Sequence, residues 1–328
     1  MKLFLTGTTG FIGQHLVRRL ESIPHTLRCL VRDLGKARSL LPGVELVQGD
    51  LADVESVRRG LAGCEGVIHL ANVYSFWERD PRIYRTVNVE GTRRVLEGAL
   101  EAGVRRVVHV SSVVIFGKPA QVPFTEESRP GPERFSEYAR TKYEGDEIAW
   151  GLHQAKGLPL VMLYPCSVLG AGDPKASGQY IADLARGRMP ARVLEHAVLT
   201  WVHVRDVAEA AVQALEREGL EGQHYLIGKH PLAVGALNQL ICQVAGISLP
   251  RLCLPDFLTL ATAAFFTGLS RLIRRPPPWG MSWDQVRTTQ VGFRAAGLKA
   301  ERELGLVYTP IHQAIAETIA ELKRTATP

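Results

Sequence analysis

The sequence has few cysteines and lacks the spacings on which cysteine-based sites depend. Five cysteines occur in 328 residues, an odd number with no Cys-x-x-Cys pair, so we expect neither a disulfide framework nor a structural zinc site. The ten histidines form no His-x-His or His-Glu-x-x-His motif, which leaves no usual starting point for a metal site. These features predict a metal-free chain in the reducing cytoplasm.

Long apolar segments and runs of like charge are also missing. The apolar stretch of residues 257–270, which carries no charge, is too short to cross a bilayer as a helix, and the apolar run Leu3–Leu5 is too short for a secretory signal. Lysine and arginine exceed aspartate and glutamate by 39 − 33 = 6, spread along the chain, and no basic run alternates with aromatic residues. We therefore expect neither a transmembrane segment nor a nucleic-acid partner.

What the sequence does contain is a regular alternation of apolar runs and amphipathic segments over its first two-thirds. The apolar runs predict strands at Leu3–Leu5, Leu27–Val31, Val44–Val47, Gly66–Leu70, Val107–Val110 and Leu160–Leu163. Helical spacing predicts helices at Phe11–Glu21, Val54–Leu61, Arg82–Ala102 and Tyr138–Gln154. Strands that are apolar on both faces and alternate with helices indicate an α/β fold with a doubly wound parallel sheet.

The alternation loosens after Gly170, which suggests a second unit in a chain long enough for two domains. We expect a strand and helix within Thr200–Ala214 and a strand at Tyr225–Ile227. The remaining segments read mainly as helices: Leu232–Ala245, Asp256–Ile273, Arg302–Leu304 and Ile311–Lys323. Residues 1–170 with about 200–230 are thus predicted to form the sheet domain, and about 171–199 with 231–328 a smaller, mostly helical lobe.

The first predicted strand leads into the first predicted helix through a glycine-rich turn with the pattern TGxxGxxG. The first glycine of such a pattern permits a tight turn, the second lets the backbone approach a pyrophosphate, and the third lets the helix pack close to the strand. N–H groups at the start of the helix then face the phosphates. The pattern predicts a dinucleotide site in the sheet domain that includes Gly7, Thr9, Gly10, Phe11, Ile12 and Gly13.

The end of the second predicted strand bears on which dinucleotide binds. NAD sites commonly place an acidic side chain there, against the ribose 2′-hydroxyl. Here Arg32 follows the strand, with Lys36 and Arg38 nearby, and a guanidinium suits a 2′-phosphate. A solvated basic turn is the alternative, and the neighbouring Asp33 keeps it open. We expect NADP rather than NAD.

Tyr138 and Lys142 stand four residues apart, on one face of a predicted helix. A phenol titrates near pH 10, too high for proton exchange at neutral pH, and a neighbouring ammonium lowers that pKa. Ser112, at the end of the fifth predicted strand, offers a hydroxyl that can hydrogen-bond a substrate carbonyl. Taken alone, the tyrosine and lysine also describe a solvent-exposed pair.

In this order, the glycine turn, Ser112 and the Tyr138–Lys142 pair resemble the extended short-chain dehydrogenase/reductase family, from Met1 to about Gly228. The resemblance implies a Rossmann fold, with Tyr138 as proton donor or acceptor. It implies that Lys142 activates Tyr138 and holds ribose hydroxyls, and that Ser112 binds the substrate carbonyl. A homodimer through paired helices is common in the family, although the sequence indicates no particular interface. Further cofactor contacts are implied at Asp50, Leu51, Ala71, Pro165 and Ser167.

Departures from the family pattern argue against two of its branches. Sugar dehydratases carry an acidic pair after the catalytic Ser, where this chain has Val113 and Val114. Nucleotide-sugar enzymes hold the diphosphate with an Asn after strand six and an Arg before the His-Val segment. This chain has Cys166–Ser167 and Leu199–Thr200 at those places. Three arginines could stand in for the missing partners: Arg186, Arg188 and Arg192.

Two local features favour a third branch. The Val31–Asp33 end of the second strand and the Trp77–Pro81 stretch resemble dihydroflavonol-reductase-like and hydroxysteroid-dehydrogenase-like members, and the hopanoid-associated epimerase-like group. We therefore expect an NADP(H)-dependent oxidoreductase that reduces a carbonyl, or oxidises a secondary alcohol, of a small and largely apolar molecule. The alternatives are a sugar epimerase and a non-catalytic NADP-binding sensor, although sensors usually lose the Tyr or the Lys.

The patterns that indicate the substrate-binding residues are weaker. Tyr74, Phe76 and Trp77 follow the fourth strand and suggest an aromatic wall, or a plug at the domain junction. Cys166 is expected near the nicotinamide, as a small apolar filler rather than a reactive thiol. The apolar segment Asp256–Ile273 ends in arginines. It could be a lid over an apolar substrate, a helix resting on anionic lipid, or a core helix or dimer contact.

Overall fold

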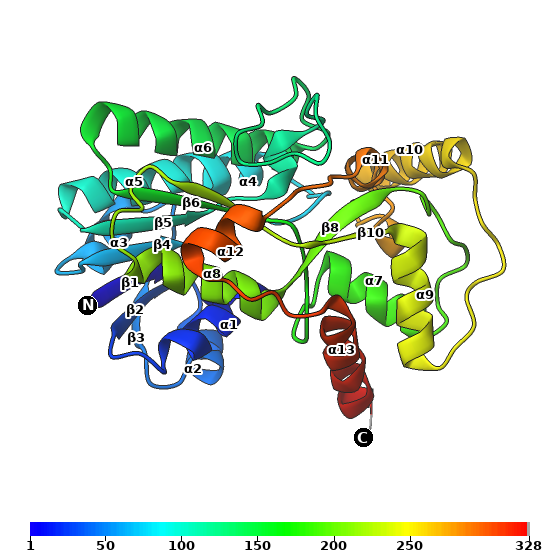
Figure 1. The fold of residues 1–328 in the computed structure, drawn as a ribbon, viewed down its shortest axis with the longest axis horizontal. Coiled ribbons are helices and arrows are strands. Elements are labelled where there is room, and N and C mark those ends of the chain that lie inside the picture. Colours follow the sequence, from blue (N-terminus) through cyan, green and yellow to red (C-terminus); the bar gives the residue numbers. More distant parts are fainter. Residues whose placement is uncertain (327–328) are drawn as a thin grey trace.

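The computed structural model describes residues 1–326 and contains a seven-stranded parallel sheet in the order β3-β2-β1-β4-β5-β6-β9 (Figure 1). Every residue of β5 and β6 is buried, because helices cover both faces of the sheet. The predicted doubly wound sheet, a Rossmann fold, is confirmed. The strands are β1 (Lys2–Thr6), β2 (Thr26–Val31), β3 (Glu45–Gln48), β4 (Gly66–His69), β5 (Arg106–Val110), β6 (Leu160–Pro165) and β9 (His224–Ile227).

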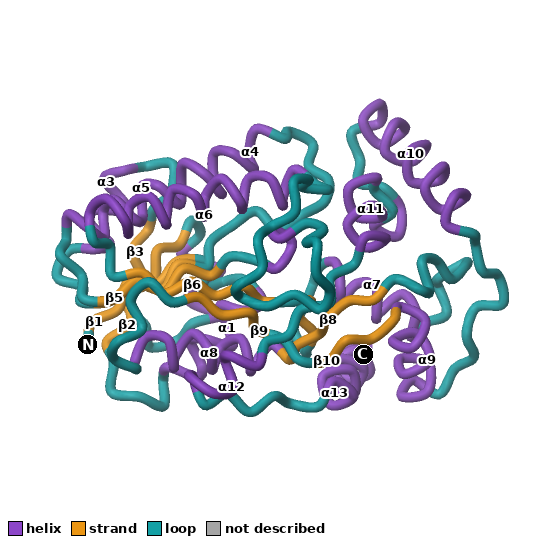
Figure 2. Tube along the Cα trace, turned by 45° about the horizontal axis from the view of Figure 1, so that its top comes forward, coloured by secondary structure: helices purple, strands orange, loops and turns teal. Residues whose placement is uncertain are grey.

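Figure 2 shows the sheet between two layers of helices. The first layer consists of α3 (Val54–Leu61), α5 (Thr92–Glu101) and α6 (Glu137–Lys156). The second consists of α1 (Phe11–Leu20), α8 (Val204–Glu216) and α12 (Leu298–Leu304), with α2 (Leu34–Leu40) near the β3 edge. The predicted helix Arg82–Ala102 is continuous but not uniform, since a π-helical segment, η1 (Arg85–Gly91), lies between α4 (Arg82–Tyr84) and α5.

A second sheet of three strands, in the order β10-β8-β7, lies in the smaller lobe and does not follow from the alternating pattern. Its strands are β7 (Ser167–Leu169), β8 (Val198–His203) and β10 (His230–Ala233). Helices α7 (Ala176–Ala185), α9 (Val234–Ala245) and α13 (Ile311–Ala326) enclose an apolar cluster beside it. Leu232 and Ala233 pair with β8 rather than extending α9, because contacts between segments distant in sequence override the local helical pattern.

Helices α10 (Asp256–Ile273) and α11 (Trp283–Val291) lie against each other at the edge of the lobe (Figures 1 and 2). Two short 3₁₀ segments are η2 (Val113–Phe116), after β5, and η3 (Pro278–Gly280), before α11. Only Thr259, Ala263 and Ser270 of α10 are buried, so α10 is not the core helix that one interpretation of its apolar sequence suggested. Within residues 1–326 it is also the one helix long and apolar enough to cross a membrane, by length and composition alone.

Candidate active site

A cavity of about 960 Å³ lies where the carboxyl ends of β1, β4, β5 and β6 face the smaller lobe. The strand order reverses between β1 and β4, and doubly wound sheets bind their ligands at such a point. The volume is at the upper end of the range for small-molecule sites. One part of the cavity is lined by the sheet domain and the other by the lobe, so a cofactor and a substrate can meet inside it.

The glycine turn lines the part of the cavity that belongs to the sheet domain. Gly7 has a φ of 76°, and a Cβ there would lie 2.6 Å from the Ala71 nitrogen, so only glycine fits between β1 and the end of β4. A Cβ on Gly13 would lie 2.2 Å from the Gly7 carbonyl oxygen. Helix α1 begins at Phe11 without a side-chain cap, which leaves its first N–H groups available to phosphates.

Arg32 and Lys36 line the far end of the same part. Both are exposed, and within residues 1–326 neither has an ion pair. Asp33 does not line the cavity, because its carboxylate caps α2 by accepting the Lys36 N–H at 3.0 Å. Asp33, the acidic residue that left the cofactor preference open, therefore caps helix α2 and does not face the cavity.

Most of the predicted site residues lie together on the cavity wall. These are Gly7, Thr9, Gly10, Phe11, Ile12, Gly13, Arg32, Asp50, Leu51, Ala71, Tyr74, Ser112, Tyr138, Pro165, Cys166 and Ser167. Two do not line it. Trp77 lies outside, while Phe76 lines the cavity in its place, and Lys142 lies behind the wall. The glycine turn, the uncapped α1 N-terminus and the two free cations fit a dinucleotide.

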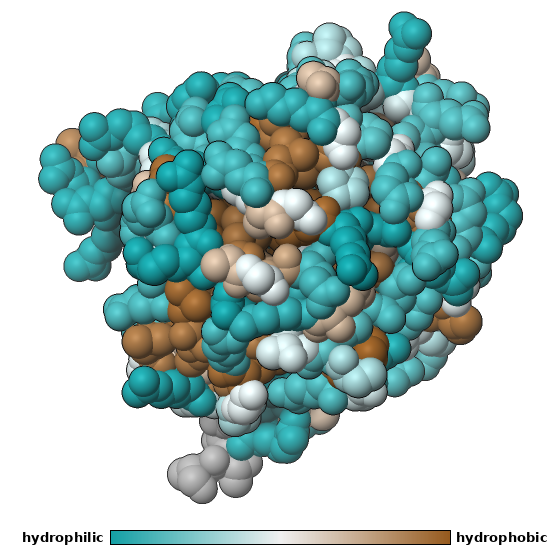
Figure 3. Space-filling model, turned by 90° about the vertical axis from the view of Figure 1, so that its left-hand side faces the viewer, coloured by the Kyte–Doolittle hydropathy of each residue, from teal (hydrophilic) through white to brown (hydrophobic). Residues whose placement is uncertain are grey.

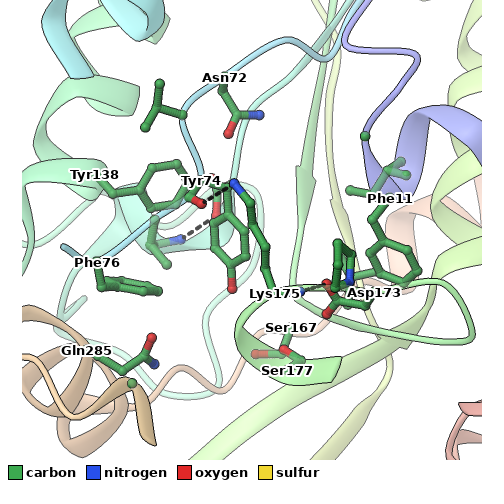
Figure 4. A pocket seen from close by; sticks show the side chains of 18 of the residues that line it. Phe11, Asn72, Tyr74, Phe76, Tyr138, Ser167, Asp173, Lys175, Ser177 and Gln285 are labelled. Carbon is green, nitrogen blue, oxygen red and sulfur yellow. Dashed lines mark hydrogen bonds between the residues drawn. The ribbon is translucent and has the colours of Figure 1, made fainter. Parts of the chain in front are cut away.

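Tyr138 is packed among aromatic side chains at the junction of the two parts. Its ring centroid lies 5.3 Å from that of Tyr74 and 5.9 Å from that of Phe76, edge to face in both cases, and Figure 4 shows the three rings together. Ser112 lies on the same cavity wall, and its side chain lowers the pKa of the Tyr138 phenol. Helix α6 positions the phenol, since the Ser136 side chain accepts the Ala139 N–H and fixes where the helix starts.

Lys142 is buried directly below this junction. Its ammonium donates to the Val110 carbonyl at 3.1 Å, at the end of β5, so the pair of Tyr138 and Lys142 is not a solvent-exposed one. Asp146, one turn further along α6, accepts the Ser111 hydroxyl at 2.6 Å and lies 3.2 Å from His109 Nε2. A buried amine, carboxyl, imidazole and hydroxyl thus form a polar cluster beneath the cavity.

Burial sets the pKa values of this cluster. It lowers the pKa of Lys142, opposed by the charge of Asp146, and it raises the pKa of Asp146 to about 7, opposed by Lys142 and Ser111. Burial also raises the pKa of Tyr138, while the Ser112 side chain lowers it. The expected lowering of the Tyr138 pKa by Lys142 is not seen, because the ammonium is turned to the Val110 carbonyl and the ring is enclosed by Tyr74 and Phe76.

Asn88 connects helix α6 to the loop after β4. Its side chain accepts the Val73 N–H at 2.7 Å and donates to the Thr141 hydroxyl at 3.1 Å. It lies in the π-helical segment η1, and π-bulges are frequent at functional sites. Asn88 therefore joins the loop after β4, which carries Tyr74, to α6, which carries Tyr138.

The lobe supplies a mainly apolar wall that the sequence patterns did not reveal. Its members come from segments scattered over about a hundred residues, so no local spacing brings them together. They include Met189, Leu194, Leu199, Trp201, Leu237, Phe266, Trp279, Met281, Val286 and Phe293, with Tyr180 and Gln285 among the polar members. Cys166 also faces the cavity, and burial raises the pKa of its thiol, which favours its predicted role as a small apolar filler.

Fold and site together define a dinucleotide-binding protein of the Rossmann type with a serine and a tyrosine in its cavity. Residues 3–228 match the NAD dependent epimerase/dehydratase family. The chain is 33% identical to sterol demethylase protein B of Methylococcus capsulatus, over 98% of both chains. It is 30% identical to a Synechocystis protein named provisionally as a dihydroflavonol 4-reductase, over 96% of this chain and 93% of that one.

Among solved structures, that of gox2253 superposes with a TM-score of 0.84 at 33% identity, covering 99% of this chain and 98% of the other. The chain therefore belongs to the NAD-dependent epimerase/dehydratase family, the extended short-chain dehydrogenases/reductases. Binding of NAD or NADP is typical of this family. The predicted family and its dihydroflavonol-reductase-like character are confirmed.

Proposed function

We propose that this protein is an NADPH-dependent reductase of a ketone or aldehyde carried by a small, largely apolar molecule. The observation that carries the proposal is the position of Tyr138 and Ser112 between a dinucleotide cradle and an apolar wall. The bound cofactor would supply hydride to the carbonyl carbon. Ser112 would hold the carbonyl oxygen, and Tyr138 would give it the proton, so that the product is a secondary or primary alcohol.

The choice of NADPH rests on Arg32 and Lys36. Both face the cavity as free cations, and Asp33 is occupied as the cap of α2. A 2′-phosphate would accept charge-assisted hydrogen bonds from the guanidinium. A ribose without that phosphate would leave both cations without a partner.

The lining also argues against a nucleotide sugar. Within residues 1–326, the arginine and lysine side chains on the cavity wall are Arg32, Lys36 and Lys175. None of the three arginines that could have held a diphosphate, Arg186, Arg188 and Arg192, lies there. Arg192 instead pairs with Glu195 at 2.8 Å.

Replacement of the proton donor tests the mechanism. We expect Tyr138→Phe to lower NADPH oxidation with a panel of ketones and aldehydes by about 10²- to 10⁴-fold, because the ring remains and only the exchangeable proton is lost. NADPH affinity should stay nearly unchanged in a fluorescence titration. Tyr143→Phe, on the same helix but outside the cavity, is the matched control and should keep its activity.

Two results would contradict the proposal. The first is full turnover in Tyr138→Phe. The second is interconversion of UDP-glucose and UDP-galactose by a protein that retains its cofactor and shows no net NADPH oxidation, which would identify an epimerase instead.

A further inference from the structure

Helix α10 differs from an ordinary surface helix in its outward side. Its outward side chains are apolar, and Phe257, Phe265 and Leu272 are 69%, 66% and 80% exposed. Its buried residues are the small side chains Thr259, Ala263 and Ser270. Surface helices of globular proteins normally turn the apolar stripe inward and the polar face to water. Within α10 the large apolar side chains that are exposed are Phe257, Leu258, Phe265, Leu269, Leu272 and Ile273.

Contacts with α11 hold the inner side of α10 in place. The Thr267 hydroxyl accepts the Trp283 N–H of α11 at 2.8 Å, and Ala263 belongs to a buried apolar cluster that includes Val286 of α11. Figure 2 shows α11 between α10 and the rest of the molecule. The helix is therefore fixed with its apolar face outward, and it could not leave α11 to span a bilayer without breaking these contacts.

Charge is confined to the two ends of this helix. No charged residue stands between Asp256 and Arg271, and Arg274 and Arg275 follow directly. The three arginines are exposed, and in the part of the chain that the structure describes none has an ion pair. An apolar face beside a cluster of exposed arginines is complementary to a bilayer whose headgroups are anionic.

The inner side of α10 is also a wall of the cavity. Thr262 and Phe266 line it, together with Trp279 from the segment before α11. The Phe266 and Trp279 rings lie 6.4 Å apart, and Trp279 is itself partly exposed. The outer face of α10 and the apolar wall of the cavity are thus separated by one helix. At the other end of the molecule, hydrophilic side chains cover most of the surface (Figure 3).

From these observations we propose that α10 docks flat on an anionic bilayer, with its apolar face below the headgroups and Arg271, Arg274 and Arg275 among them. We propose further that the carbonyl substrate is a bilayer-dissolved lipid that reaches the cavity past Phe266 and Trp279. The second statement rests on the proposed function, whereas the docking does not.

Sedimentation with vesicles tests the docking. The full chain should pellet with phosphatidylcholine vesicles that contain phosphatidylglycerol. Phe265→Glu/Leu272→Glu should weaken this binding at least about tenfold, since it places two carboxylates on the docking face. Arg274→Glu/Arg275→Glu should weaken binding to the mixed vesicles by a similar factor, since each arginine near an anionic surface contributes separately. Val307→Glu, at an apolar position 85% exposed but outside α10, is the matched control.

The Phe265→Glu/Leu272→Glu variant also separates folding from docking, because neither side chain lines the cavity. It should reduce a water-soluble ketone at the wild-type rate. Equal pelleting of wild type and this variant would overturn the docking. The docking would also be overturned if the full chain did not bind vesicles and instead formed a dimer, measured by analytical ultracentrifugation, that this variant abolishes. Helix α10 would then contact a second copy of the chain.

A second assay addresses the origin of the substrate. A long-alkyl analogue of an active ketone, dissolved in mixed vesicles, should be reduced by the wild type at least about tenfold faster than by Phe265→Glu/Leu272→Glu, because docking concentrates enzyme and ketone on one surface. Equal rates for the two proteins would overturn substrate uptake from the bilayer and leave docking intact. Vesicle binding without NADPH oxidation on any ketone would instead refute the proposed function.

Discussion

The carboxyl group of Asp146 is buried, and it lies beside Lys142 and His109, which are also buried. The pKa of His109 lies well below its usual value because of burial and the charge of Lys142, so the imidazole is neutral over the working range. Asp146 is therefore the group of this cluster that titrates near neutral pH. Its charge is coupled to that of Lys142, which lies one turn from Tyr138 on the same helix.

Stability should consequently depend on pH through Asp146. The pKa of its carboxyl is about 7 in the folded protein, against the ordinary value of 3.8, so the folded state holds the proton more tightly. Its contribution to the free energy of unfolding is complete below about pH 4 and is lost as the pH rises to about 7. Asp146→Asn, which cannot titrate, should lack this decline. Urea unfolding of both proteins at pH 5 and pH 8 measures it, and an equal stability difference at both values would refute the assignment.

Arg32 should determine the cofactor preference. Loss of a charge-assisted hydrogen bond corresponds to about 1.5–3 kcal/mol. Arg32→Ala should therefore raise the KM for NADPH about 10- to 100-fold and change that for NADH much less. Arg38→Ala removes a neighbouring exposed cation that does not line the cavity, and it should leave both values near those of the wild type. A preference for NADH in the unmodified protein would contradict the assignment.

At the scale of elements, two helical glycines occupy opposite environments. Gly13 packs against the backbone of the phosphate turn, whereas a Cβ on Gly151 of α6 would meet nothing within 4 Å. Gly13→Ala should cost about 1–3 kcal/mol of stability through overpacking and abolish NADPH binding, because the turn must move. Gly151→Ala should raise stability by about 0.4–1 kcal/mol. Thermal unfolding and cofactor titration of the two variants give the comparison. Tight NADPH binding by Gly13→Ala would contradict the assignment of the glycine turn as the phosphate site.

The elements themselves could be predicted to different degrees. Strands β1, β2, β4, β5 and β6 and helices α1, α3 and α6 follow from periodicity, since each is apolar on both faces or along one stripe. The π-helical segment at Asn88 could not be found this way, because one extra residue in a turn leaves the helical pattern almost intact. Strand β7 has three residues and is defined by its partner β8 rather than by its own composition.

At the scale of the whole molecule, the cavity is shared by the sheet domain and the lobe, so a bound cofactor should stabilise both. NADPH at 100 times its Kd adds about 2.7 kcal/mol to the free energy of unfolding. We expect one cooperative thermal transition that moves to higher temperature with NADPH, and less with NADH at the same concentration. Two transitions, of which only one responds to NADPH, would show that the lobe does not share the site.

The sequence by itself determined the Rossmann sheet and the phosphate turn, and it predicted Ser112, Tyr138 and Lys142 as site residues. Each of these depends on residues close together in the chain, where backbone geometry and periodicity limit the choices. Only the tertiary structure decided that Lys142 bonds to β5 rather than facing the cavity, that Phe76 and not Trp77 reaches Tyr138, and that α10 turns its apolar face outward. These outcomes depend on contacts between segments that are distant in the sequence. Local sequence patterns do not show which of those segments come into contact.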